Sequence, residues 1–140
     1  MAHEVRIVYN TIQQQSTLDR LLHWKNTNAC RAMTFVVTLL ENLIDDHLHG
    51  QEKDTSFSEI VTVTYSNTLQ QYHGWLTSGT FTLLLKLVPY KDSFWNSLPV
   101  DRDNPKQVQS MQDFCQAFRQ VLNDIYRFLD NNNLNNPAKV

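Results

Sequence analysis

The apolar residues of this chain recur every three or four positions over long stretches. Between Lys106 and Asn131 they stand at Val108, Met111, Cys115, Phe118, Leu122, Ile125 and Leu129. This spacing places them on one face of an α-helix, where they can pack against a core. The stretch Ala29–Ile44 has the same period, at Ala29, Ala32, Met33, Val36, Leu39, Leu40, Leu43 and Ile44. The sequence therefore predicts long amphipathic helices.

Two further helices are expected between these stretches. Residues 56–72 keep the helical period through Leu69 and Tyr72, which argues against a strand over the β-branched run Ile60–Tyr65. Residues 75–88 are apolar nearly all round, so we expect this helix to be central. Pro89 ends it, because the residue before a proline is driven out of the helical region.

The remaining segments are shorter or polar. Weak helical patterns cover residues 4–14 and 17–24, and the residues 26–28 read as a break with a helix cap. Residues 45–55 and 99–105 are expected to be loops, and 92–98 a short helix. Gly74 and Gly79 are expected to permit a close approach or a slight bend.

The scarcity of turn-forming residues agrees with this reading. Only 3 glycines and 4 prolines occur in 140 residues, and chains that turn often need more of both. The length suggests one domain, with no repeat and no linker, so residues 1–140 are expected to form a single all-α domain.

Several classes of function are disfavoured by composition. The net charge is −2 and no block of Lys or Arg stands out, so nucleic acid is not an expected partner. Cys30 and Cys115 read as buried thiols in a reducing compartment. The longest apolar run, Phe81–Val88, contains Lys86 and is too short to span a bilayer. The first residues lack a signal or myristoylation pattern, and we expect a cytoplasmic protein.

Uncommon residues at fixed spacing extend from Tyr65 to Leu98. They read Tyr65-x3-Leu69-x2-Tyr72-His73-Gly74-Trp75, then an apolar helix, then Pro89-Tyr90-Lys91-x2-Phe94-x3-Leu98. This pattern is similar to the signature of the glycolipid transfer protein family, in which a Tyr-His-x-Trp turn precedes an apolar helix and a proline-containing turn. Ala29–Ile44, with Arg31 and Phe35 in register, resembles a long helix of that family, and Ile125-Tyr126 before Lys139-Val140 resembles its end.

The resemblance implies a fold and a function. The fold is an all-α, two-layer helical sandwich that encloses one lipid, here with shortened N-terminal helices. The protein would take a sphingolipid, either a glycosphingolipid or ceramide-1-phosphate, from one membrane and deliver it to another. It would not be an enzyme, would need no cofactor or metal, and would touch membranes transiently. Enclosing acyl chains is favourable because each buried CH₂ contributes about 0.8 kcal/mol.

The resemblance also implies site residues. His73 would hydrogen-bond the lipid amide as donor or acceptor, unless its ring is simply satisfied by backbone. Trp24 and Lys25 would lie near the headgroup, although Trp24 is equally an ordinary half-buried tryptophan. Arg31 could hold a phosphate bidentately or lie solvated on a helix face. Tyr72 and Trp75 are expected in the core. The predicted acyl-chain pocket consists of Phe35, Leu39, Phe114, Phe118, Val121 and Leu122.

One family motif is absent. The family places Asp, Asn four residues later and Lys three further on, along one helix face. Here Val8-Tyr9-Asn10-Thr11 resembles the segment after that motif, so Glu4 takes the lysine position. The chain is therefore either a lipid carrier with a rebuilt headgroup site or a lipid-sensing or regulatory module without transfer activity. A plain helical interaction protein with an apolar groove is the third alternative. His47-x-His49 lacks a third ligand, so no metal site is expected.

Overall fold

The computed structural model describes residues 27–50 and 55–135, and these residues are helical apart from short connections. The elements are a helix through residues 27–49, α2 (Phe57–Thr68), η1 (Gln70–Tyr72), α3 (Trp75–Leu84), η2 (Leu85–Leu87), α4 (Lys91–Ser97) and α5 (Pro105–Asn131). No strand occurs within these ranges. The all-α prediction is confirmed, and so is the rejection of a strand at Ile60–Tyr65. The helical patterns expected at 4–14 and 17–24 lie outside the described residues.

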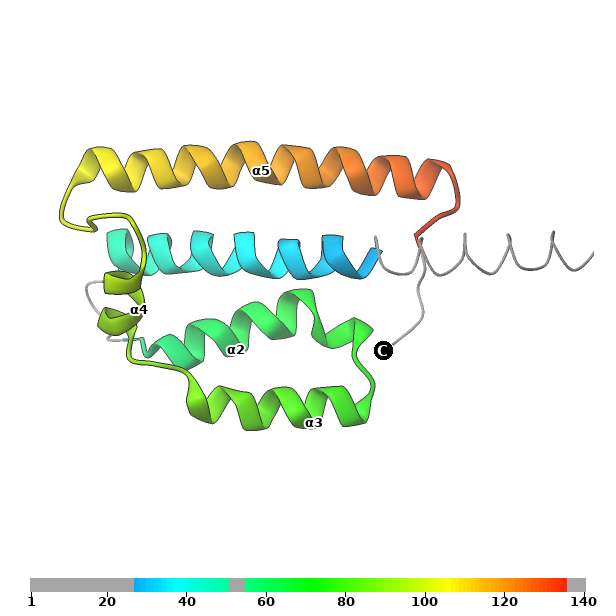
Figure 1. The fold of residues 1–140 in the computed structure, drawn as a ribbon, viewed down its shortest axis with the longest axis horizontal. Coiled ribbons are helices and arrows are strands. Elements are labelled where there is room, and N and C mark those ends of the chain that lie inside the picture. Colours follow the sequence, from blue (N-terminus) through cyan, green and yellow to red (C-terminus); the bar gives the residue numbers. More distant parts are fainter. Residues whose placement is uncertain (1–26, 51–54, 136–140) are drawn as a thin grey trace, which may run out of the picture.

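The long helices lie side by side along the long axis of the molecule (Figure 1). Their order across the row is α5, the helix of residues 27–49, α2 and α3, and α4 lies at one end. Side-chain contacts join the neighbours: Thr34 bonds Tyr126 of α5 at 3.2 Å, and the Asn42 amide donates to Thr64 of α2 at 2.9 Å. The neighbouring helices of the row are therefore in contact through their side chains.

Local sequence fixes where two of the helices begin. Ser56 caps α2 by accepting from the Glu59 amide, while the Glu59 carboxylate accepts from the Ser56 amide, which forms a capping box. Asn104 caps α5, and Pro105 follows at its first turn, where a missing N–H costs nothing. Such caps satisfy amides that a helix leaves unpaired.

The core lies between the helix of residues 27–49, α2 and α5, with α4 closing one end. Its buried cluster consists of Val37, Leu43, Ile44, Phe57, Ile60, Val61, Trp95, Val108, Met111, Cys115 and Leu122. Leu43 is fully buried and Trp95 is 2% exposed. Both cysteines are buried free thiols, as expected.

Two expected boundaries are wrong. Residues 27 and 28 are already helical, so the predicted break does not include them. The loop expected from Asp45 starts later, because the helix continues to residue 49. His49 Nδ1 lies 2.9 Å from the Asp45 carboxylate one turn earlier, and the Gly50 amide still donates to the Asp46 carbonyl. Polar side chains that pair at this spacing are compatible with a helix.

The prediction that residues 75–88 form a central helix is also wrong. α3 lies at the outer edge of the row (Figure 1), and Trp75 is 87% exposed and Leu87 79% exposed. The expectation of Trp75 in the core fails with it. A Cβ added at Gly79 would meet nothing within 4 Å, so Gly79 permits no close approach. Apolar residues all round a helix show that it can be buried on every side, not that neighbours are there to bury it.

No helix among the described residues is both long enough and apolar enough to cross a membrane.

Candidate functional site

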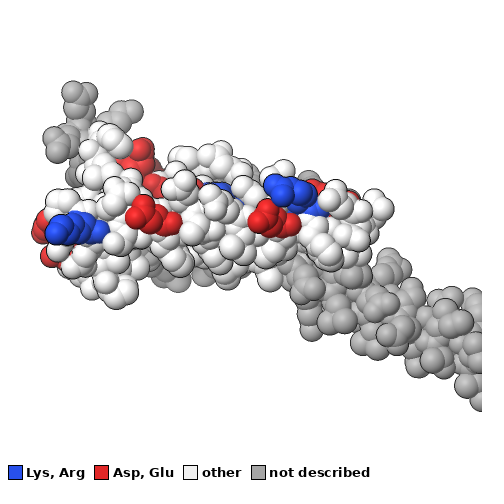
Figure 2. Space-filling model, turned by 90° about the horizontal axis from the view of Figure 1, so that it is seen from above, with Lys and Arg blue, Asp and Glu red and all other residues white. Residues whose placement is uncertain are grey.

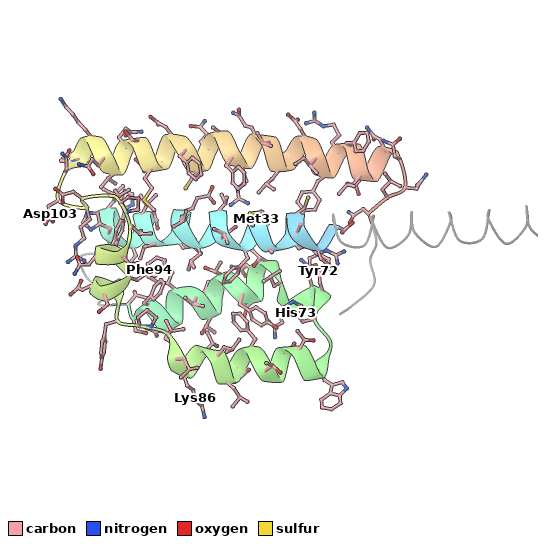
Figure 3. All side chains as sticks on the ribbon, in the orientation of Figure 1. Met33, Tyr72, His73, Lys86, Phe94 and Asp103 are labelled. Atoms are coloured by element: carbon pink, nitrogen blue, oxygen red, sulfur yellow. The ribbon has the colours of Figure 1, made fainter. Side chains whose placement is uncertain are left out.

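The site centres on the turn that joins α2 to α3. The chain leaves α2 through η1, where the Tyr72 amide donates to the Leu69 carbonyl at 2.9 Å and the His73 amide to the Gln70 carbonyl at 3.2 Å. His73 then becomes extended, with φ −96° and ψ 135°, and Gly74 caps α3. The backbone amide and side chain of His73 are thereby fixed where two helices meet (Figure 3).

A tyrosine and a serine hold the His73 ring. The Tyr65 hydroxyl lies 3.0 Å from His73 Nδ1 and donates to Ser78 Oγ at 3.2 Å. The Tyr65 ring stacks on Phe81 with centroids 3.7 Å apart. Within the described part of the chain, His73 Nε2 has no hydrogen-bond partner. The alternative that backbone groups satisfy the imidazole ring is therefore not what these residues show.

Partial burial affects the charge of His73. Burial lowers the pKa of the imidazole below its ordinary value, because desolvation penalises the cation. The ring is thus neutral at neutral pH, with one nitrogen as a donor and the other as an acceptor.

Arg31 lies beside this turn and is buried. Only 4% of the residue is exposed, and its guanidinium stands 3.8 Å from the centroid of the Tyr72 ring. Its Nη1 also donates to the Asn28 side chain at 3.2 Å. The alternative of a solvated arginine is wrong, because stacking on an aromatic face holds this side chain in place. Tyr72, expected in the core, is half-buried beneath it.

Tyr126 of α5 completes the surroundings of Arg31. Burial raises the pKa of the Tyr126 phenol, and the nearby Cys30 and Tyr72 act in the same direction, while its bond to Thr34 and the Arg31 charge oppose the rise. The structure therefore places Arg31 against Tyr72, the residue before His73, although Arg31 is far from both in the sequence. Trp24 and Lys25 lie outside the described residues.

Comparison with known proteins adds the family. Residues 3–100 match the family model described as glycolipid transfer protein. The chain belongs to the glycolipid transfer protein family. This membership supports the predicted fold class, and because family members are lipid transfer proteins that catalyse no reaction, it also supports the expectation of a non-enzyme.

Individual relatives agree with this family. The chain is 34% identical over 100 residues to glycolipid transfer protein 1 of Arabidopsis thaliana, which covers 71% of this chain and 45% of the relative. It is 25% identical over 147 residues to the glycolipid transfer protein of Danio rerio, which covers 94% of this chain and 68% of that protein. Glycolipid transfer protein A of Xenopus laevis is 27% identical over 101 residues, 69% of this chain and 46% of the relative. The chain thus spans about half the length of the curated relatives it matches.

The residues predicted for an acyl-chain pocket occupy two environments. Leu122 is 3% exposed in the core, and Phe35, Leu39 and Phe118 pack against that core. Phe114 and Val121 are 57% and 51% exposed on α5. The pocket of this family member therefore stays a prediction, with one part of the set in the core and another on the surface.

Two hollows among the described residues lie away from His73. The larger, about 1030 Å³, is lined by polar residues that include Asp45, Asp46 and Glu59. A smaller hollow of about 430 Å³ lies between the helix of residues 27–49 and α5. Neither is lined by a residue of the predicted acyl-chain set.

The two histidines of the His47-x-His49 pattern have other partners. His47 Nε2 lies 2.9 Å from the Arg102 carbonyl, and His49 Nδ1 lies 2.9 Å from Asp45. The described ranges contain no group of three or more potential metal ligands.

Sequence reasoning missed the roles of Tyr65 and Ser78. From the sequence alone, Tyr65 is only a part of the expected helix 56–72 and of the family signature. A buried tyrosine needs a partner for its hydroxyl, and that requirement is the feature of the sequence that points toward a polar neighbour.

Proposed function

We propose that this chain binds a sphingolipid, with His73 at the lipid amide, and carries it between membranes. Family membership supports lipid binding in general. The observation that supports His73 in particular is the geometry of its ring. Tyr65 holds the ring through Nδ1, while Nε2 has no partner among the described residues.

The hydrogen-bond set around Tyr65 suits an amide. The Tyr65 hydroxyl has a single proton. When it donates to Ser78, His73 Nδ1 carries the ring proton and Nε2 accepts a bond from the amide N–H. When Tyr65 donates to Nδ1 instead, Nε2 carries the proton and donates to the amide carbonyl. Both arrangements keep the imidazole neutral and leave one polar atom for the lipid.

Arg31 is our candidate for the headgroup. Its guanidinium is held on Tyr72, the residue next to His73, so a cation lies close to the proposed amide site. A guanidinium matches the geometry of a phosphate, which favours ceramide-1-phosphate over an uncharged sugar. Trp24 and Lys25 remain predicted headgroup residues on the same reasoning from the family.

Exposed side chains of α3 and of the segment that follows it are our candidate for the transient membrane contact. Trp75 is 87% exposed, Tyr90 88% and Leu87 79%. Tryptophan and tyrosine favour the interface between lipid and water, because their rings are apolar and carry one polar atom. We also propose that the protein is cytosolic and contacts membranes peripherally.

Transfer of a fluorescent sphingolipid between vesicles tests the proposal. His73→Ala should reduce transfer roughly tenfold, since an unpaired amide group in a buried site costs about 1–3 kcal/mol. His49→Ala is the matched control and should transfer at the wild-type rate, because His49 is an exposed histidine at the C-terminal end of the helix of residues 27–49. Helicity by circular dichroism should be near normal in both variants. Equal transfer by the two variants would remove His73 from the site.

Two more substitutions address the headgroup. Arg31→Lys keeps the charge and loses the planar contact with Tyr72, so ceramide-1-phosphate transfer should fall more than glucosylceramide transfer. A similar loss of transfer for both lipids would assign Arg31 to packing.

Trp24→Ala should reduce any response of tryptophan fluorescence to lipid. An unaltered fluorescence response would place Trp24 away from the site.

The second candidate function is a lipid-sensing or regulatory module without transfer activity. The specific observation in its favour is the Glu4 residue at the position where the family motif has lysine. Such a module would retain lipid seen by mass spectrometry of the purified protein, yet transfer no faster than protein-free vesicles. A well-folded preparation without lipid would favour a plain helical interaction protein.

A further inference from the structure

α5 carries two apolar stripes, and the core occupies one of them. The buried stripe consists of Val108, Met111, Cys115, Leu122 and Leu129. The other, the outer stripe, consists of Phe114, Phe118, Val121, Ile125 and Phe128, spaced alternately by four and three residues. Phe128 is 60% exposed, Phe114 57%, Val121 51% and Ile125 37%. An alternating spacing of four and three is that of a helix-pairing seam.

Most of the outer stripe is exposed to solvent, and of its five residues only Phe118 packs partly against the core. α5 lies at the edge of the row, with the helix of residues 27–49 on one side only (Figure 1). The bonds from Arg119 to Glu41 and from Tyr126 to Thr34 join these two helices through residues that are not part of the outer stripe. On the neighbouring helix, Met33 and Val36 are each 42% exposed.

Charge does not oppose contact along this stripe. In the view onto α5, charged side chains are few and scattered, and most of the visible surface is uncharged (Figure 2). Between Phe114 and Phe128, Arg119 pairs with Glu41, and Asp124 pairs with Arg127 at 3.1 Å. No like-charged cluster would have to be desolvated there.

The area fits an interface. Aromatic side chains present roughly 150–250 Å² each, so the exposed parts of the outer stripe amount to roughly 400 Å². That lies within the range for the largest apolar patch of a monomer, roughly 300–600 Å², and such patches often have a function. Two such patches in contact would bury on the order of 1,000 Å², the lower bound for a specific interface.

We propose that a second copy of this chain covers the outer stripe, through an antiparallel contact of α5 with its counterpart. The order of the stripe is nearly symmetric about Val121. A two-fold axis there sets Phe114 opposite Phe128 and Phe118 opposite Ile125, so each copy presents the same surface to the other, as an isologous dimer requires. Phe114, Phe118 and Val121 also belong to the predicted acyl-chain set. The second copy would thus supply a facing wall for bound acyl chains. This part of the proposal rests on the proposed function.

Sedimentation of the purified 140-residue chain tests the pairing. The wild type should have the mass of a dimer at roughly 100 μM, a concentration at which even a micromolar complex is populated. Val121→Glu and Phe128→Glu should each give the mass of one chain. Val63→Glu changes an equally apolar residue that is 54% exposed on α2, and it should remain dimeric. Circular dichroism should show the same helicity in all three variants. If a glutamate variant loses its helices, Phe114→Gln replaces it.

Either of two results overturns the pairing: a wild type with the mass of one chain, or stripe variants that stay dimeric. Vesicle transfer separates this result from the proposed function. A dimer that transfers no lipid supports the pairing and ends the carrier proposal, whereas a monomer that transfers lipid does the reverse.

Discussion

At the residue scale, the main feature is the hydrogen-bonded network of Tyr65, His73 and Ser78, which lies beside the stacked rings of Tyr65 and Phe81. Tyr65 contributes a ring to the packing with Phe81 and a hydroxyl to His73 and Ser78. A hydroxyl in such a place is tolerated only with partners, because a buried polar group without a hydrogen bond is costly. The same bonds that satisfy Tyr65 therefore hold the histidine.

Tyr65→Phe keeps the stacked ring and removes both hydrogen bonds. We expect the free energy of unfolding to fall by about 1–2 kcal/mol, since His73 and Ser78 lose a partner together. Urea unfolding followed by circular dichroism measures the change. Tyr90→Phe, at a residue 88% exposed, serves as control and should change stability by less than about 0.5 kcal/mol. Equal effects would mean that the Tyr65 hydroxyl contributes nothing.

The lowered pKa of His73 makes stability depend on pH. In the unfolded chain the imidazole titrates near its ordinary value of 6.5, while burial lowers the pKa in the fold. The unfolded state then binds more protons at mildly acidic pH, so the stability contributed by neutral His73 is complete above that value. It is lost as pH falls through the lower folded pKa. His73→Gln should flatten the dependence of urea stability on pH between roughly pH 7 and pH 5. Parallel curves for the two proteins would contradict this.

At the element scale, two glycines have opposite surroundings. Gly79 lies inside α3, and a Cβ there would meet nothing within 4 Å. Gly50 follows the helix of residues 27–49, and a Cβ there would stand 2.3 Å from the Asp46 carbonyl oxygen. Helix propensity therefore decides the effect of a substitution at Gly79, and steric exclusion decides it at Gly50.

Gly79→Ala should raise the free energy of unfolding by about 0.5–1 kcal/mol, because alanine loses less backbone entropy in a helix. Gly50→Ala should lower it by at least about 1 kcal/mol, because the backbone must shift to admit the methyl group. Thermal unfolding of both variants provides the comparison. A stabilised Gly50→Ala protein would show that the turn adjusts freely.

At the scale of the whole molecule, long-range contacts hold one end of the row together. The Lys91 ammonium reaches the Asp46 carboxylate and the Thr55 carbonyl, both at 2.8 Å. His47 bonds the Arg102 carbonyl, and its ring lies against Trp95 with centroids 5.5 Å apart. These contacts seat α4 over the end of the core that includes Leu43.

Leu43→Ala should strongly lower the free energy of unfolding. The side chain is fully buried, and replacing a core leucine by alanine costs about 2–5 kcal/mol through lost transfer energy and the cavity left behind. Leu48→Ala changes a leucine of the same helix that is 42% exposed and should cost much less. The urea midpoints of the two variants measure this difference, and similar midpoints would contradict the assigned core.

The helices and the family resemblance follow from the amino-acid sequence alone. Apolar spacing located the helix cores at Ala29–Ile44 and Lys106–Asn131, because helical periodicity is a local property of the chain. The Tyr72-His73-Gly74-Trp75 run pointed to His73 as the candidate site residue for the same reason, since its residues are neighbours in the sequence. Only the tertiary structure decided that α3 lies at an edge, that Arg31 is buried on Tyr72 and that Tyr65 holds His73. Burial and hydrogen bonding depend on which surfaces meet, and residues distant along the chain decide that.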